Sequence, residues 1–284
     1  MTCMSNAAKN KIILWAIDPD HLNDETPTTL KILREWSQKL ECQVQPLSIF
    51  TEDKLQSLPL DTDTITANLR DYFPAEFNLP KILVIRSSSR RKMAARFNRY
   101  AVDLKASYIF VRARNLSGAF FHLGGFTEAL LAQTLVPTVV LNVNAQVKRF
   151  DAPIIFPTDF KRSSLIAMKL VIRFVQQSKS PLELFNQIEH HSRSVMNEIK
   201  VQRGKTAKRW TRHLRSAGIE SSVHFSVDHN SLAEEIIQEA SRARAGLIIM
   251  PSRPMSLPYS LIGSNVKKVL MLAKCPVMVI NRKV

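Results

Sequence analysis

The residue types that most often perform catalysis or bind metals are present, but their spacing matches no common catalytic signature. The sequence lacks a G-x-S-x-G elbow, a P-loop, H-E-x-x-H, C-x-x-C and a glycine-rich dinucleotide fingerprint. Adjacent His190 and His191 project in different directions. The other histidines fall on unrelated segments, at His21, His122, His213, His224 and His229. We therefore expect a protein that is not an enzyme, has no metal site, and uses its histidines on the surface or in packing.

Cysteine content and hydropathy indicate the cellular compartment in which the chain resides. Cys3, Cys42 and Cys275 are odd in number and widely spaced, which argues against a disulfide framework or a thiolate metal site. The apolar run that precedes Asp18 is too short for a signal peptide, and no later run approaches the length of a membrane span. We expect a cytoplasmic protein with reduced thiols.

The chain is strongly basic, with 40 Lys+Arg against 24 Asp+Glu, a net charge of +16 and a pI near 10.0. Such a field attracts nucleic acid, anionic lipid or acidic proteins. Residues 86–99 contain no acid, and residues 193–215 contain only Glu198. The basic residues are Arg86, Arg90, Arg91, Lys92, Arg96 and Arg99 in the first segment, and Arg193, Lys200, Arg203, Lys205, Lys208, Arg209, Arg212 and Arg215 in the second. Both segments are candidates for contact with an anionic partner, either nucleic acid or an acidic protein.

The segment 193–215 also has an ordinary structural interpretation, which we favour. Its apolar residues recur near helical spacing, at Val195, Ile199, Trp210 and Leu214. An amphipathic helix would pack this stripe on a sheet and leave its basic face in solvent. Gly204 is a position where such a helix could break.

Apolar residues alternate between short β-rich runs and longer stretches with helical spacing, which is typical of parallel sheets. In the first half the expected strands are 11–18, 42–50, 81–87, 107–113 and 137–143. Helices are expected near 27–40 and after Gly124-Gly125. Prolines interrupt residues 51–80, so we expect an irregular or partly helical connection there.

The second half repeats this order. Its expected strands are 152–160, 182–189, 222–229, 246–252 and 275–282, and its expected helices lie near 163–178, 231–243 and 264–273, with the long basic helix between the second and third strands. Gly124 and Gly263 stand the same distance after the fourth strand of their half. A duplicated five-stranded unit explains this pattern. We place one domain at residues 1–145 and a second at 150–284, with the linker around Asn144 to Asp151.

The second half carries a specific resemblance. IIFPTDF followed by a helix, then GLIIMPSRP, LIGSNVKKVL and CPVMVI, resembles the universal stress protein family from first strand to last. The first half, with WAIDPD and the aligned tail, resembles the same family more weakly, so the whole chain resembles a tandem member. The resemblance implies an α/β fold of two tandem five-stranded parallel-sheet domains with helices on both faces, as in adenine nucleotide alpha hydrolase-like proteins. Ligands of such sheets bind at the carboxyl ends of the strands, where strand order reverses.

Family members that bind ATP carry Gly-x-x-Gly after the fourth strand and Gly-Ser at the start of a later helix, where backbone amides meet phosphates. The resemblance places an acid that meets adenine at Asp159. It assigns the ligand site to Pro157, Thr158, Asp159, Met250, Arg253, Gly263, Ser264 and Asn265. The weaker first-domain equivalents are Asp18, Arg112, Arg114, Gly124 and Gly125.

This chain departs from the ATP pattern in both halves. Pro251 and Pro254 replace the loop glycines of the second half, and the spacer MSLPYSLI is one residue short. In the first half Arg112 and Asn115 hold the loop positions, and Gly124-Gly125 replaces Gly-Ser. Proline has no N–H to donate and cannot take a positive φ. We expect ATP binding to be lost or remodelled, and we assign no certain cofactor.

Each candidate residue also has a structural alternative. Asp159 and Asp18 could cap the turns after the first strands, and Ser264 could be the N-cap of the final helix. Arg253 and Arg114 could be solvated surface arginines, or they could replace lost amide contacts to an anion.

Together these observations favour a non-catalytic stress-response protein that binds and regulates. A nucleotide-binding switch and a basic nucleic-acid-associated factor are the alternatives. Family dimers often pair through the fifth strand, and a tandem chain can satisfy that edge internally. We therefore expect a monomer with a pseudo-dimeric interior, in which Val139 to Val143 and Val277 to Asn281 lie near the interface as separate sheets.

Overall fold

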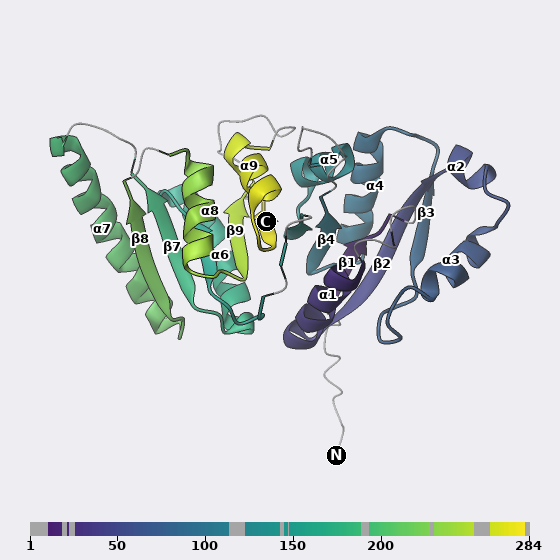
Figure 1. The fold of residues 1–284 in the computed structure, drawn as a ribbon, viewed down its shortest axis with the longest axis horizontal. Coiled ribbons are helices and arrows are strands. Elements are labelled where there is room, and N and C mark those ends of the chain that lie inside the picture. The colour runs from purple at the N-terminus through teal and green to yellow at the C-terminus, as the bar shows by residue number, and fades with distance from the viewer. Residues whose placement is uncertain are drawn as a thin grey trace, which may run out of the picture.

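The structure is a computed structural model of the 284-residue chain, and it describes residues 11–18, 22, 26–113, 123–142, 145–146, 148–188, 193–227, 230–252 and 262–281. Two halves with the same order of elements lie side by side (Figure 1). None of the helices in these ranges is long and apolar enough to cross a membrane.

The first half alternates strands and helices as the apolar pattern predicts. Its strands are β1 (Lys11–Ala16), β2 (Cys42–Thr51), β3 (Lys81–Ile85), β4 (Tyr108–Arg112) and β5 (Thr138–Leu141). Its helices are α1 (Thr26–Leu40), α2 (Glu52–Gln56), α3 (Thr62–Arg70), α4 (Arg90–Asp103) and α5 (Gly125–Gln133). The partly helical connection expected over 51–80 is confirmed by the short helices α2 and α3.

The second half repeats the order with one helix between each pair of strands. Its strands are β6 (Ile154–Pro157), β7 (Leu182–Gln187), β8 (Ser221–Ser226), β9 (Leu247–Pro251) and β10 (Val277–Ile280). Its helices are α6 (Arg162–Ser178), α7 (Arg193–Ser216), α8 (Leu232–Arg242) and α9 (Ser264–Leu272). The helix α7 continues through Gly204, so the expected break there is wrong. A single glycine in a helix interior lowers helix stability by only about 1 kcal/mol, which the buried stripe of α7 offsets.

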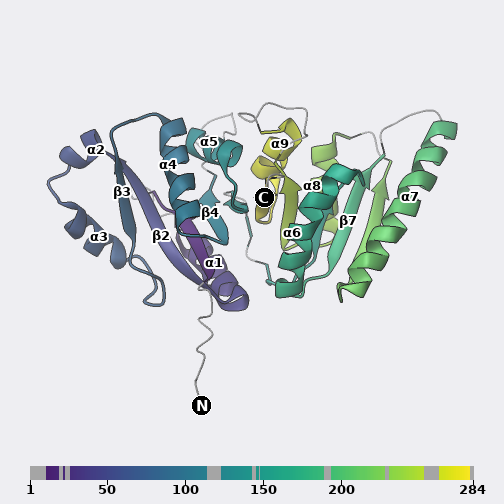
Figure 2. The same cartoon turned by 180° about the vertical axis from the view of Figure 1, so that it is seen from behind.

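All ten strands form one sheet in the order β3-β2-β1-β4-β5-β10-β9-β6-β7-β8. Pairing is parallel within each half, and strand order reverses between β1 and β4 and between β6 and β9. Helices cover both faces: α1, α6 and α7 contribute to the core on one side, and α4, α5, α8 and α9 contribute to the core on the other. In the view from behind, α6 lies in front of the sheet (Figure 2).

The two halves join through their fifth strands. Strands β5 and β10 are antiparallel, with Val140 opposite Val277 and Val139 opposite Met278. The expected position of these strands at the interface is confirmed, whereas the expectation of separate sheets is wrong. Edge strands with free N–H and C=O groups pair most completely by continuing the ladder, so satisfying both edges produces one mixed sheet.

A reciprocal pair of asparagines reinforces this junction. The Asn142 amide, after β5, donates to Leu270 O at 3.0 Å and to Ala273 O at 2.7 Å at the end of α9. The Asn281 amide, after β10, donates to Thr134 O at 2.9 Å at the end of α5. Both side chains are buried and satisfy helix-terminal carbonyls of the opposite half. The two halves therefore contact each other through equivalent residues, as expected for a pseudo-twofold junction.

Candidate functional site

The expected ligand crevice lies where strand order reverses in the second half, between the carboxyl ends of β6 and β9. Adjacent parallel strands with crossovers to opposite faces leave such a crevice outside the sheet. Strand β6 ends at Pro157 and strand β9 ends at Pro251, so both predicted segments reach the same edge. The tertiary structure thus brings together the two parts of the motif that the sequence separates by about ninety residues.

Thr158 and Asp159 form a turn that starts α6. The Thr158 hydroxyl accepts from Phe160 N at 3.1 Å, while Asp159 Oδ1 accepts from Lys161 N at 3.0 Å and from the Ser164 hydroxyl at 2.7 Å. Asp159 Oδ2 lies 4.0 Å from Lys161 Nζ. The structural alternative for Asp159, a turn cap, is therefore confirmed by its contacts. Its side chain is still 40% exposed, so the carboxylate also remains accessible to solvent.

The residues before and after Pro251, at the end of β9, are held by contacts with the neighbouring strand β10. Met250 is buried, Pro251 is in register with Ile280 of β10, and Ser252 N donates to Ile280 O at 2.8 Å. The buried Ser252 hydroxyl has no hydrogen-bond partner within the part of the chain that the structure describes. Arg253 and Pro254 lie outside the described residues. The loop that would contact a phosphate therefore begins from a rigid proline rather than from a glycine.

Helix α9 begins at the crevice, and its first residues differ from the expected arrangement. Gly263 is the N-cap and Ser264 is the first helical residue, so Ser264 as N-cap is wrong. An N-cap must have extended φ and ψ angles, and the backbone adopts them at Gly263, with φ −60° and ψ 140°. Gly263 is buried, whereas Ser264 and Asn265 are exposed.

Of the first-half equivalents, the structure describes Asp18, Arg112, Gly124 and Gly125. Arg112 ends β4, and its carbonyl accepts from the Thr127 hydroxyl at 3.2 Å. Gly124 is the N-cap of α5 with φ 85°, and a Cβ at Gly125 would lie 2.7 Å from the Arg90 side chain. Asp18 is half-buried after β1, and Arg114 lies outside the described residues. The Arg90 side chain of α4 therefore lies against Gly125, the first residue of α5 and one of the expected ligand-site positions.

The basic helix α7 contacts the end of β7 through Arg203. The sequence does not distinguish this residue from the other basic residues of its segment. Arg203 Nη1 donates to Asn186 Oδ1 at 2.8 Å and to Gln187 O at 3.0 Å at the end of β7. The Asn186 amide in turn donates to Thr158 O at 2.6 Å. This chain of hydrogen bonds fixes the predicted Thr158 turn from the neighbouring strand. Only a tertiary contact reveals it, because Arg203 is one of eight similar basic residues in its segment.

The amphipathic interpretation of α7 is confirmed in its C-terminal part. Ala207, Trp210 and Leu214 are buried, whereas Val195 is 41% exposed, so its expected packing on the sheet is wrong. Ala207 lies about one turn before Trp210 and belongs to the same buried stripe. The first turns of α7 extend past the core.

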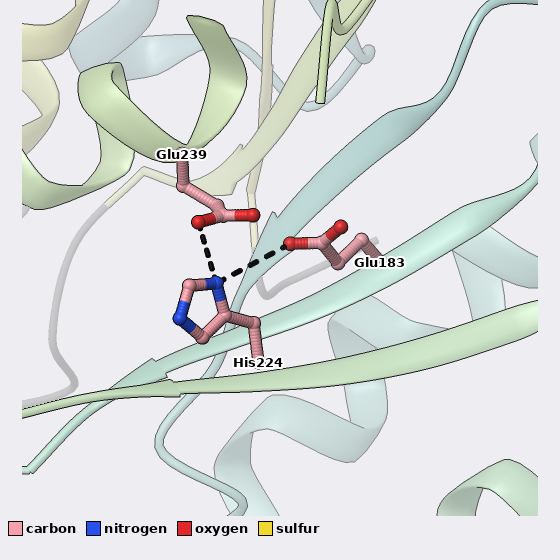
Figure 3. Close-up of side chains that lie close together, drawn as sticks. All are labelled: Glu183, His224 and Glu239. Carbon is pink, nitrogen blue, oxygen red and sulfur yellow. Dashed lines mark ion pairs between the residues drawn. The ribbon is translucent and has the colours of Figure 1, made fainter. Parts of the chain in front are cut away.

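A cluster of charged residues on β7, β8 and α8 was not predicted from the sequence (Figure 3). Glu183 of β7, His224 of β8 and Glu239 of α8 approach one another, with His224 Nδ1 2.5 Å from Glu239 Oε2 and 3.9 Å from Glu183 Oε1. Arg242 Nε donates to Glu239 Oε1 at 2.9 Å, and its Nη2 lies 3.4 Å from Glu183 Oε1. His224 was expected on the surface or in packing, and it does contact the Phe185 ring edge-on.

Burial and two neighbouring acids set the charges of this cluster. Burial, together with hydrogen bonding to Glu239 and its charge, raises the pKa of Glu183 to about 7. Burial alone would raise the pKa of Glu239, but hydrogen bonds from Arg242 and Glu183 and the charge of His224 hold it below its usual value. Three groups here could ligate a metal geometrically. Arg242 already supplies the neutralising cation, so the donor set fits an ion-pair network between α8 and the sheet better than a metal centre.

Both cysteines in the described ranges are free and buried. Burial raises the pKa of the Cys42 thiol to about 11 and that of Cys275 to about 12. At neutral pH both are therefore protonated thiols.

The sheet order defines the class of protein: a tandem α/β chain with two parallel half-sheets, in each of which strand order reverses once. Residues 152–281 match the model of the universal stress protein family. The second half therefore belongs to that family, and the first half has the same fold.

Solved structures resemble the whole chain as well as its halves. A universal stress protein from Archaeoglobus fulgidus is 17% identical, with a TM-score of 0.65, and the match covers 96% of this chain and 99% of that one. A protein of unknown function from Pseudomonas aeruginosa is 12% identical, with a TM-score of 0.66, over 96% of this chain and 93% of that one. At these identities the likeness shows the tandem fold alone. A search of curated proteins found no match to the sequence.

Proposed function

We propose that this tandem universal stress protein acts by binding and regulating rather than by catalysis, and that its ATP site is lost or remodelled. The observation that carries the proposal is Pro251 at the last position of β9, where ATP-binding members have the first glycine of the phosphate loop. A second proline follows at Pro254, and in the first half Arg112 and Asn115 hold the corresponding positions. The boundaries of the two domains, at 1–145 and 150–284, belong to the same proposal.

The energetic argument rests on lost hydrogen-bond donors. Each charge-assisted bond to a phosphate is worth on the order of 1.5–3 kcal/mol. If both loop positions served the triphosphate, two prolines would remove roughly 3–6 kcal/mol, enough to turn a micromolar site into a millimolar one. Contacts of Asp159 with Lys161 and Ser164 further support a structural role for the residue that would meet a base.

Isothermal titration calorimetry with Mg-ATP at physiological salt tests this proposal. We expect weak or undetectable binding by the wild-type protein and no release of phosphate. The double variant Pro251→Gly with Pro254→Gly should gain affinity by tenfold or more, because it restores two amide donors and the loop's freedom. Pro258→Gly, in the same loop but away from both glycine positions, is the matched control and should gain nothing.

The proposal has a specific counter-result. A wild-type dissociation constant in the low micromolar range, abolished by Asp159→Ala or Ser264→Ala, would make the nucleotide-binding switch the better function. Retention of a nucleotide by the natively purified protein, detected by mass spectrometry, would point the same way.

A further inference from the structure

Two grooves at the junction of the halves are related by the pseudo-twofold symmetry. The first is lined by Ile32, Glu35 and Trp36 of α1 together with Gly246, Leu247 and Pro276. The second is lined by Leu170, Arg173 and Phe174 of α6 together with Ser107, Tyr108 and Pro137. Each set occupies the same positions in its half, since α1 and α6 are followed by left-handed residues at Glu41 and Lys179 and then by β2 and β7.

The chain's own linker fills the first groove. Gln146 N donates to Lys274 O at 2.9 Å, Phe150 N donates to Glu35 Oε1 at 2.8 Å, and the Ser180 hydroxyl donates to Phe150 O at 3.0 Å. The Phe150 ring lies 5.3 Å from Trp36, edge-on. With the linker in place, a cavity of only about 10 Å³ remains. An extended peptide with one aromatic side chain is therefore the kind of group that this type of groove accepts.

The second groove has no such segment among the described residues that line it, and it retains a cavity of about 480 Å³. This volume is within the range of binding pockets for molecules of drug size. Apolar side chains at its rim are left in solvent: Val102 is 48% exposed and Leu135 is 47% exposed. The Tyr108 hydroxyl donates to Gln177 Oε1 at 3.3 Å on one wall, so that wall is already ordered.

Charge distinguishes the two grooves. Glu35, which receives a backbone N–H in the filled groove, has Arg173 as its counterpart in the open one, and Lys105 is a second exposed cation on the rim. An occupant of the open groove must therefore present acceptors or acids where the linker presents donors and bases. The chain's own residues 1–10, MTCMSNAAKN, contain lysine and no acid, so they fit poorly.

We propose that the open groove is a docking site for an acidic peptide segment of a partner protein, carrying one aromatic side chain that covers the exposed Val102 and Leu135. Acids flanking that aromatic residue pair with Arg173 and Lys105. The inference is independent of the ATP site, which lies at the carboxyl ends of β6 and β9.

A charge-swap experiment tests the docking site. The probe is the fluorescein-labelled peptide AQVEEFDA, which is the linker sequence with both of its basic residues replaced by glutamate, and the comparison peptide is the native AQVKRFDA. Fluorescence polarisation at low salt should show binding of AQVEEFDA at least tenfold tighter than of AQVKRFDA. Arg173→Glu with Lys105→Glu should reverse this preference, whereas the exposed α6 variant Lys169→Glu should leave it unchanged.

Three results would overturn the proposal. The first is no binding of either peptide up to millimolar concentration, and the second is an unchanged preference in the charge-swapped variant whose thermal melt matches the wild type. The third is a tenfold or larger gain in peptide affinity on deletion of residues 2–10, which would assign the groove to the chain's own N-terminus.

Discussion

Glu183 lies in an environment that opposes the ionisation of its carboxyl group. A glutamate in a strand of a basic protein would ordinarily be ionised at neutral pH. Here burial and the neighbouring Glu239 raise its pKa to about 7, although Arg242 lies beside it. Burial and the neighbouring carboxylate destabilise the ionised form of Glu183 by more than the shared Arg242 guanidinium stabilises it.

This environment predicts a pH-dependent stability. Because the folded-state pKa of Glu183 exceeds its unfolded value, its contribution to stability is complete below about pH 4.5 and is lost as pH rises through about 7. Glu183→Gln should remove this loss, which is on the order of 2–3 kcal/mol. Urea denaturation from pH 5 to pH 8 should therefore give a flatter profile for the variant than for the wild type.

The control for this prediction is Glu220→Gln, an exposed glutamate outside the cluster, which should keep the wild-type slope. Groups facing Glu183 are Glu239, His224 and Arg242, and all three remain in the variant. A Glu183→Gln profile parallel to the wild type would show that Glu183 is ionised in the folded protein.

At the scale of elements, the two basic segments differ in how much of their charge is free. In α7, Arg203 is bound to the end of β7, whereas Lys200, Lys205, Lys208, Arg209, Arg212 and Arg215 are exposed. In residues 86–99, Arg90 lies against Gly125 and Arg86 pairs with Glu52 at 3.2 Å, whereas Arg91 and Lys92 are exposed. Exposed charges contribute little to folding, so these are the ones available to a partner.

Neutralisation of the free charges separates a binding role from a structural one. Arg91→Gln with Lys92→Gln should change the unfolding free energy by less than about 0.5 kcal/mol. It should weaken binding to any anionic partner. In salt titrations with mixed-sequence DNA and RNA, the affinity of the variant should also fall less steeply with salt concentration than that of the wild type. Lys208→Gln with Arg209→Gln provides the same test on α7. A large loss of stability would show instead that the clusters hold the fold together.

At the scale of the whole molecule, the junction makes two domains into one structural unit. The paired β5 and β10 bury their strand edges, and Trp36 of the first half contacts Phe174 of the second with ring centres 5.2 Å apart. A further ion pair joins Lys267 of α9 to Glu128 of α5 at 2.7 Å. With these edges satisfied internally, a monomer in light scattering remains the expected state.

Cooperativity tests this junction. Asn142→Ala removes the donor for two buried carbonyls of the opposite half, so it should lower the unfolding free energy by about 1–3 kcal/mol. Because the halves share one sheet, the variant should still unfold in a single transition by circular dichroism. Asn265→Ala, an exposed asparagine on α9, is the control. Two separate transitions, of which only one is shifted, would mean that the halves unfold independently.

Much of the fold follows from local sequence. Alternation of β-rich runs such as KIILWA and LIIMP with longer helical stretches determined the ten strands, because parallel strands buried on both faces are continuously apolar. The aligned positions of Gly124 and Gly263 determined the duplication. The sequence also predicts that Pro251 has no N–H to donate to a ligand, because proline lacks this group in any structural context.

Only the tertiary structure decided how those elements meet. The continuous sheet depends on the antiparallel register of Val140 with Val277, which no local pattern encodes. Glu183, His224 and Glu239 come from three elements, and their spacing in sequence carries no signal. The groove beside Arg173 is lined by α4 of the first half and α6 of the second, which lie far apart in sequence. The sequence therefore determined the repeated unit, whereas packing between its two copies determined the junction and the groove, because such contacts depend on long-range geometry.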